Sequence, residues 1–144
     1  MSGPRPLHRI EYGAVMAARA LVRPLPMTAV LGIGALLGRA FHFFDRSHRR
    51  LALQNLEAAF PGRPARERAA IARDMFVHFG HLLTVLLKFS TMTPNQMLAC
   101  VEFEGEDRVR AAHALNKGVL LFTGHFGYWE INALVHALAL YPMA

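Results

Sequence analysis

The sequence predicts an α/β fold that follows a set of membrane-associated helices. Three observations predict it: an apolar and basic N-terminal third, a long helix with an apolar stripe, and a strand–helix–strand–helix order after residue 100. Of the 144 residues, 53% are hydrophobic, and the formal net charge is +6. A chain of this length is long enough for one modest domain with its own core. We expect it to be mostly helical.

The positive charge is confined to the N-terminal third. Residues 1–50 hold eight arginines against two acidic residues, a net charge of +6, whereas residues 51–144 hold eight basic and eight acidic residues. Basic residues interleaved with apolar runs favour an anionic lipid surface as partner over nucleic acid. We therefore predict two parts: residues 1–50, a basic, apolar, membrane-associated helical segment, and residues 51–144, the beginning of a second domain. No nucleic acid partner is expected.

The first elements alternate between helical runs and proline breaks. Residues 10–22 have helical apolar spacing, and the prolines of the segment 23–26 end that helix. The uncharged run 27–38 is shorter than the roughly 20 residues that span a bilayer, and Arg39 follows it. This favours an interfacial or obliquely inserted hairpin over a span; a buried helical pair in a soluble protein is the alternative. The arginines of residues 45–50 put that end on the cytoplasmic side.

A long amphipathic helix follows. Residues 51–60 begin as a helix that stops at Pro61-Gly62, and Pro64 opens the helix 66–88. Its apolar stripe is spaced by three or four: Ile71, Met75, Phe79, Leu82 and Leu86.

No metal site or disulfide is predicted. His78 and His81 share a face of the long helix, but the sequence offers no third ligand beside them. Cys100 is the only cysteine, so no intrachain disulfide can form.

The C-terminal part predicts alternating strands and helices. Thr93 caps a short helix, residues 101–105 alternate as a strand, residues 106–118 are helical, residues 119–123 form a strand buried on both faces, and residues 128–140 form a helix. That order indicates an α/β layer. Because one strand with one neighbour is a poor sheet, we expect the chain to be a fragment.

A histidine and a glutamate follow the second strand. His125 lies between Gly124 and Gly127 at the strand end, and Glu130 comes five residues later at the start of a helix. A neutral imidazole accepts a proton from an attacking hydroxyl, and a carboxylate orients the ring and stabilises the imidazolium. The pattern predicts His125 as general base with Glu130 as its partner. A structural histidine and a metal ligand are the alternatives.

Residues around the pair are expected to contact the substrate. Glycines permit a sharp turn and a close approach of ligand to backbone, and the aromatic residues form the wall of a pocket. The predicted substrate-binding residues are Gly124, Phe126, Gly127 and Trp129. Backbone N–H groups near Gly127 and the helix start are expected to stabilise an oxyanion.

The segment "NKGVLLFTGHFGYWE" (residues 116–130) resembles the His-x₄-Glu/Asp motif of the lysophospholipid-acyltransferase superfamily. More narrowly, the chain is similar to the bacterial lipid A biosynthesis (lauroyl/myristoyl) acyltransferases. Residues 55–80 are similar to the segment that precedes the motif in that family, and "VEFEG" recurs ahead of it. Tyr128 departs from the Asn often found there, which affects acceptor or chain-length details rather than the chemistry.

The resemblance implies a glycerolipid-acyltransferase-like α/β domain and an enzyme of the inner membrane, on its cytoplasmic face. It implies transfer of a fatty acyl chain from acyl carrier protein or coenzyme A to a hydroxyl of a membrane glycolipid, with no other cofactor. His125 would be the base and Glu130 its partner. Family chains run to about twice this length, so residues 1–144 are expected to be an N-terminal part that is inactive by itself.

Other functions remain open at this point. One alternative within the superfamily is acylation of another glycolipid, such as a phosphoinositide mannoside. A non-catalytic, membrane-associated lipid-binding module is a second class, and a metal-dependent hydrolase is a third.

Overall fold

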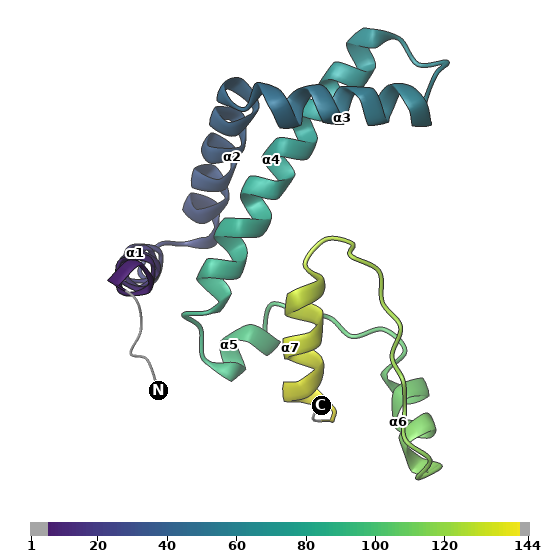
Figure 1. The fold of residues 1–144 in the computed structure, drawn as a ribbon. Helices are drawn as coiled ribbons and strands as arrows, with labels where there is room; N and C mark the ends of the chain where they lie inside the picture. Colours follow the sequence, from purple (N-terminus) through teal and green to yellow (C-terminus); the bar gives the residue numbers. More distant parts are fainter. Residues whose placement is uncertain (1–5, 142–144) are drawn as a thin grey trace. The chain divides into compact units, whose positions relative to one another are not determined.

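The computed structural model describes residues 6–141, which form helices and irregular segments (Figure 1). The chain divides into two compact units, residues 1–88 and 89–144, and each is described by itself. The first five residues of the predicted membrane segment lie outside the described residues, as do residues 142–144. The boundary predicted after residue 50 rests on charge and stays a prediction.

The first unit is helical, as predicted. Its helices are α1 (Pro6–Val22), α2 (Met27–Phe44), α3 (Arg46–Ala59) and α4 (Ala65–Phe89), of which only the last residue of α4 belongs to the second unit. The prolines after α1 and the Pro61-Gly62 pair after α3 separate the helices where the sequence predicted breaks. α2 continues through Arg39 to Phe44, so the helix is longer than the uncharged run within it.

Polar contacts join the helix ends of this unit. Lys88 Nζ donates to the Arg23 carbonyl at 2.7 Å, which links the end of α4 to the end of α1. Arg68 Nη2 lies 2.9 Å from Glu57 Oε1 and links the start of α4 to α3. These contacts are largely exposed, so they position the helices more than they stabilise them.

Helices α2 and α4 lie side by side (Figure 1) and meet through glycines. A Cβ atom on Gly34 would lie 2.7 Å from the Gly80 carbonyl oxygen and 2.5 Å from Thr84 Oγ1. A Cβ atom on Gly80 would overlap the Gly34 carbonyl oxygen, and one on Gly38 would overlap the backbone of α4. The two backbones therefore approach more closely than any side chain at these positions permits, as in helix pairs that pack within membranes.

Substituting Gly34 with Ala tests this contact, and Gly32 on the same helix is its matched control. We expect Gly34→Ala to destabilise the protein by about 1–3 kcal/mol, because the new methyl group overlaps α4. A Cβ atom on Gly32 meets nothing within 4 Å. Gly32→Ala should therefore stabilise the protein by up to about 1 kcal/mol through helix propensity. Unfolding of the detergent-solubilised full-length protein measures both; equal effects would contradict the close contact.

Much of the apolar surface of this unit is exposed. Its buried apolar side chains are few and small: Val22, Val30, Ala52, Ala72 and Val85. Large apolar side chains of α2 and α4 face outward instead, among them Leu36, Phe43, Phe44, Phe79 and Leu83. Both helices are long and apolar enough to cross a membrane, by length and composition. An exposed apolar surface of this kind is typical of a contact with lipid or with another protein. Spanning versus interfacial insertion stays a prediction.

The second unit holds α5 (Pro94–Leu98), α6 (Glu106–Ala114) and α7 (Trp129–Ala139). Thr93 caps α5 as predicted: its hydroxyl accepts from the Gln96 N–H, and the Gln96 side chain accepts from the Thr93 N–H at 2.9 Å. α5 packs against α7. The rings of His113 and Tyr141 stack 3.6 Å apart, which links the end of α6 to the residues that follow α7.

The two predicted strands are absent from the part of the chain that the structure describes. Residues 101–105 and 119–123 form no β-ladder, so the α/β class is not seen over residues 6–141. Nor is the second segment buried on both faces, because Leu120 is 88% exposed and Phe122 is 96% exposed. A strand forms only where a neighbouring backbone takes up its hydrogen bonds, and apolar alternation alone does not supply that neighbour.

Candidate functional site

His125 lies at the centre of a tight turn just before α7. The Phe126 N–H donates to the Gly124 carbonyl at 2.8 Å, which closes a three-residue γ-turn around His125. Gly127 then adopts a φ of +56°, a left-handed conformation that glycine adopts without a steric cost. This turn lies between residue 123 and the start of α7, as the two glycines predicted, whereas their contact with a substrate stays a prediction.

The His125 side chain is exposed and lies beside Trp129. Their ring centroids are 4.5 Å apart and their planes are inclined by 58°. Because Trp129 is the first residue of α7, the contact sets the imidazole against the N-terminal end of that helix. Within the described residues, no hydrogen bond engages the imidazole nitrogens, so the ring is accessible to a substrate.

Glu130 is the second residue of α7, and its side chain is exposed. No hydrogen bond or ion pair joins it to His125 in the described part of the chain. The structure therefore places the predicted pair at the same helix start without bringing the two side chains into contact. An acidic residue in the first turn also interacts favourably with the positive end of the helix dipole.

The start of α7 lacks a side-chain cap. Tyr128 occupies the N-cap position and makes no capping hydrogen bond, while the Ile131 and Asn132 N–H groups bond to its carbonyl. Burial raises the pKa of the Tyr128 phenol, so this side chain stays neutral at physiological pH. The Trp129 and Glu130 N–H groups, the first two of the helix, follow directly after the turn that carries His125.

A cavity of about 330 Å³ lies within the second unit. Trp129 lines it and also touches His125, so this ring stands between the imidazole and the cavity. The other lining residues come from the two predicted strand segments, from α6, and from α7 and its end. They include Phe103, Glu106, Val109, Leu121, Asn132 and His136.

Most of this lining was not predicted from the sequence. Helical spacing could have indicated it, because it places four of the lining residues on one face of α7 and at its end: Trp129, Asn132, His136 and Leu140. His136 is one of the lining residues, although it was not among the predicted site residues. The other predicted substrate contacts, Gly124, Phe126 and Gly127, are exposed on the turn, and Phe126 is 89% exposed.

The comparison with known proteins identifies the family. Residues 4–144 match the model of the bacterial lipid A biosynthesis acyltransferases. The chain belongs to this family.

Two relatives agree with this assignment. The chain is 29% identical over 124 residues to the lipid A biosynthesis myristoyltransferase of Escherichia coli K12. It is 29% identical over 124 residues to lipid A biosynthesis acyltransferase 1 of Shigella flexneri. Each match covers 86% of this chain and 38% of the relative, so the chain spans about two fifths of their length. No solved structure matches the chain.

The geometry at His125 suits proton transfer at an exposed position. An imidazole on a glycine-flanked turn, next to a helix start without a side-chain cap, can take a proton from one atom while helix N–H groups stabilise a developing negative charge. Among the described residues, no three His, Cys, Asp or Glu side chains come together as metal ligands.

Proposed function

We propose that the full-length protein transfers a fatty acyl chain from an acyl thioester, carried by acyl carrier protein or coenzyme A, to a hydroxyl of a membrane glycolipid, as in the late acylation of lipid A. Membership of the lipid A acyltransferase family supports the reaction class. The observation that carries the proposal is the exposed His125 at the centre of a glycine-flanked turn before α7.

The reaction follows from general acid–base chemistry. The His125 imidazole accepts the proton of the acceptor hydroxyl while the hydroxyl oxygen attacks the thioester carbonyl. The resulting oxyanion faces the backbone N–H groups at Gly127 and the uncapped start of α7. When the intermediate collapses, the carbon–sulfur bond breaks and the imidazolium returns its proton to the departing thiolate. An ester and a free thiol result, and no other cofactor is required.

Glu130 stabilises the imidazolium in this proposal. It lies in the first turn of the helix that follows His125, and a change of its exposed side-chain rotamer when substrate binds would direct the carboxylate toward the ring. Hydrogen bonds of catalytic groups are often long or absent before the substrate is bound. The apolar part of the cavity beside Trp129, formed by Phe103, Leu121 and Phe122, accommodates part of the acyl chain in this proposal.

The exposed apolar helices α2 and α4 support a location at the membrane, where a glycolipid acceptor resides. The arginines at the start of α3 favour the cytoplasmic face of the inner membrane. They also attract an acidic carrier protein, an effect on the association rate that weakens with salt.

Product analysis tests the function. The full-length protein is incubated with acyl thioesters of different chain length, on acyl carrier protein or coenzyme A, and with lipid A precursors or phosphoinositide mannosides. Mass spectrometry should show the acceptor heavier by one acyl group, with one free thiol released per ester. If only the phosphoinositide mannoside were acylated, the acceptor would not be a lipid A precursor, and the proposed acceptor class would be wrong. If the protein bound lipid but formed no product with any combination of thioester and acceptor, a non-catalytic lipid-binding module would be favoured.

A further inference from the structure

The indole ring of Trp129 touches the His125 imidazole and is itself fixed by α7. It is half-buried and lines the cavity of the second unit. The helix that carries it is anchored by Ile131, which is 7% exposed, and by Val135, which is fully buried. α5 packs against the same helix. A side chain at the start of an anchored helix has a well-defined position, which suits it to hold a neighbouring group in place.

His125 has no such anchor of its own. It lies on the turn between residue 123 and α7, where its side chain and that of Phe126 are exposed. Among the described residues, no hydrogen bond or ion pair engages its ring. An exposed side chain without such a partner exchanges rapidly between rotamers. The restraint is the indole, since the 4.5 Å between the two ring centroids lies within the range of about 4.5–7 Å at which aromatic rings attract each other.

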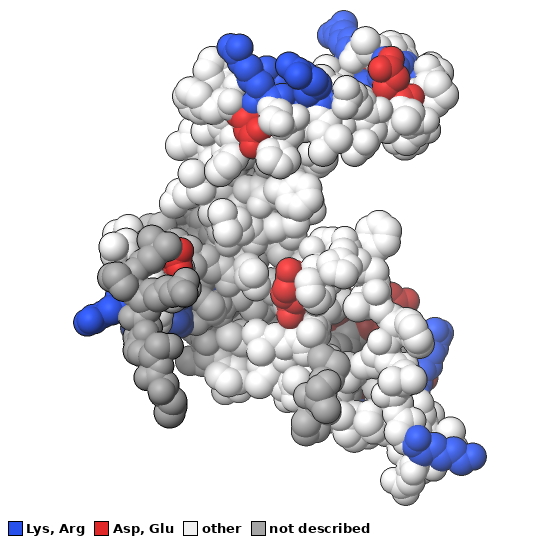
Figure 2. All heavy atoms as spheres, viewed as in Figure 1, with Lys and Arg blue, Asp and Glu red and all other residues white. Residues whose placement is uncertain are grey.

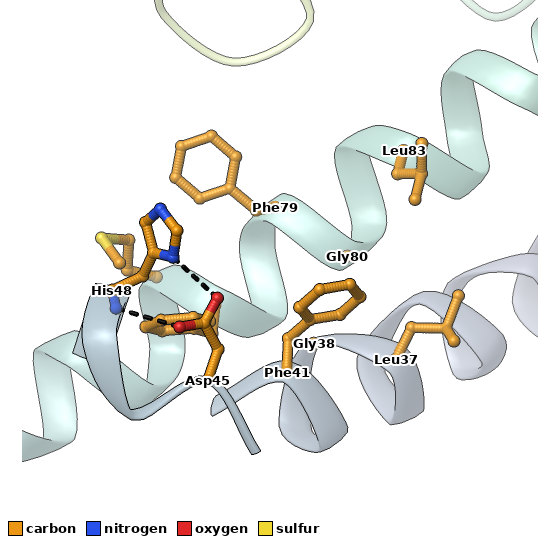
Figure 3. Close-up of a pocket in the computed structure, with 10 residues that line it drawn as sticks. Leu37, Gly38, Phe41, Asp45, His48, Phe79, Gly80 and Leu83 are labelled. Atoms are coloured by element: carbon orange, nitrogen blue, oxygen red, sulfur yellow. Dashed lines mark hydrogen bonds and ion pairs between the residues drawn. The ribbon is translucent and has the colours of Figure 1, made fainter. Parts of the chain in front are cut away.

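His48 in the first unit shows a different way to hold an imidazole. Its ring nitrogen Nδ1 lies 2.7 Å from Asp45 Oδ2, at the polar end of an apolar groove between α2 and α4 (Figure 3). The groove has a volume of about 320 Å³, and Gly80 is among its lining residues. The His48 backbone N–H donates to the same carboxylate at 3.0 Å. There a carboxylate fixes the ring, which Glu130 does not do for His125 in the described structure.

Charged side chains are also sparse along the segment that carries His125. Lys and Arg side chains gather over the start of α3, the stretch that holds His48 (Figure 2). Residues 119–141, by contrast, contain no Lys or Arg, and Glu130 is their one acidic residue. Apart from Glu130, this segment therefore holds no charged side chain that could orient the imidazole, and the contact with Trp129 is the restraint that the structure shows.

We propose that Trp129 is a positioning residue for the general base: its indole holds the His125 imidazole beside the start of α7, oriented for proton transfer. This inference rests on the proposed function. It gives Trp129 a second task beside the expected contact with substrate, because the ring both touches the imidazole and lines the cavity. A base has to lie within hydrogen-bond reach of the proton that it takes, and a misplacement of about 1 Å can lower a rate roughly 10²-fold.

The kinetics of Trp129→Leu in the full-length protein test this role. We expect kcat for acyl transfer to fall about 10–10²-fold, because the imidazole loses its restraint. Trp129→Phe keeps an aromatic ring beside the imidazole and should retain most of kcat. In the His125→Ala background, Trp129→Leu should lower kcat no further, since a positioning residue acts only through the group that it positions. A wild-type kcat in Trp129→Leu, or additive losses in the double variant, would overturn the proposal.

Acyl chains of different length separate positioning from a role in the cavity wall. A positioning loss lies in kcat and is equal for short and long thioesters, because the imidazole acts on the proton of the acceptor. Loss of a wall raises KM and grows with chain length. Leu121 lines the cavity, so Leu121→Ala should show this second pattern. If Trp129→Leu raises KM in the same way without a loss of kcat, it is a wall residue and the proposal is wrong.

Tyr141 provides the matched control. Its ring stacks on another imidazole of the same unit, that of His113, with 3.6 Å between the centroids, and it does not line the cavity. Tyr141→Leu removes a comparable contact and should keep wild-type kcat. Thermal unfolding shows whether each variant is folded. If folded Tyr141→Leu loses as much kcat as Trp129→Leu, a general loosening of the unit explains both losses, and the positioning role is refuted.

NMR observes the ring contact without turnover. In full-length protein labelled with ¹³C in its histidine rings, the His125 signal is identified by its loss in His125→Ala. The ring current of the indole shifts this signal, so it should move in Trp129→Leu and stay in place in Tyr141→Leu. An unmoved signal in Trp129→Leu would refute the positioning role even if the wild-type protein is active. If the signal moves but the wild-type protein forms no product, the proposed acyl transfer is wrong, and the positioning role falls with it.

Discussion

Replacing His125 with Ala in the full-length protein is expected to lower the rate of acyl transfer by about 10²–10⁴-fold, because the acceptor hydroxyl loses its general base. The loss should appear in kcat, with little change in KM for the thioester, since the imidazole acts on the proton in transit rather than on the acyl chain. Each tenfold loss corresponds to about 1.4 kcal/mol of transition-state stabilisation. Steady-state kinetics with the thioester and acceptor found by product analysis measure it.

His136 provides the control. It lies on the same helix and lines the cavity, but it does not belong to the turn that carries His125. His136→Ala should therefore alter KM or chain-length preference more than kcat. A His125→Ala variant that folds and retains wild-type kcat would contradict the proposed base and would favour a structural role for the histidine. If the wild-type protein and the His125→Ala variant bound lipid equally and neither catalysed acyl transfer, a binding module would be favoured instead.

Glu130→Gln should lower kcat by about 10²-fold or more, with the His125→Ala loss as its upper limit, because the imidazolium loses its stabilising charge. The amide keeps the size of the side chain and removes only the charge. Combining it with His125→Ala should produce no further loss, since residues that act as a unit are strongly non-additive. The kinetics of the two single variants and of the double variant provide the measurement.

Glu102 is the matched carboxylate. It is exposed in the same unit and does not line the cavity, so Glu102→Gln should keep wild-type kcat. Additive losses from His125→Ala and Glu130→Gln would show that the carboxylate acts independently of the imidazole, for example on the helix dipole. The His125 and Glu130 side chains make no contact in the described structure, so the kinetics of the double variant decide whether they act together.

The helices of this chain could be predicted because their signals are local. Helical apolar spacing predicted α1 and α4, prolines predicted the breaks before α2 and after α3, and Thr93 predicted the cap of α5. The turn at His125 was also predicted, since glycines on both sides of a residue favour a sharp reversal. Membership of the family could likewise be inferred from residues 116–130 and 55–80.

The strands could not be predicted in the same way. Residues 119–123 have the composition of a buried strand, yet Leu120 and Phe122 are exposed and no ladder forms over residues 6–141. A strand depends on hydrogen bonds to residues distant in sequence, so its pattern states a preference that only a partner fulfils. The same limit applies to the lining of the cavity, which Phe103 and His136 share although 33 positions separate them in the chain.

The sequence by itself determined which segments of the first unit are helical, where the charge lies and which turn carries the imidazole, because each depends on residues within a few positions of one another. Only the tertiary structure decided that Gly34 and Gly80 meet, that an apolar groove with a polar end opens beside them, and that His125 and Glu130 share a helix start without contact. Those features arise from packing between segments, and packing is not encoded in any single stretch of residues.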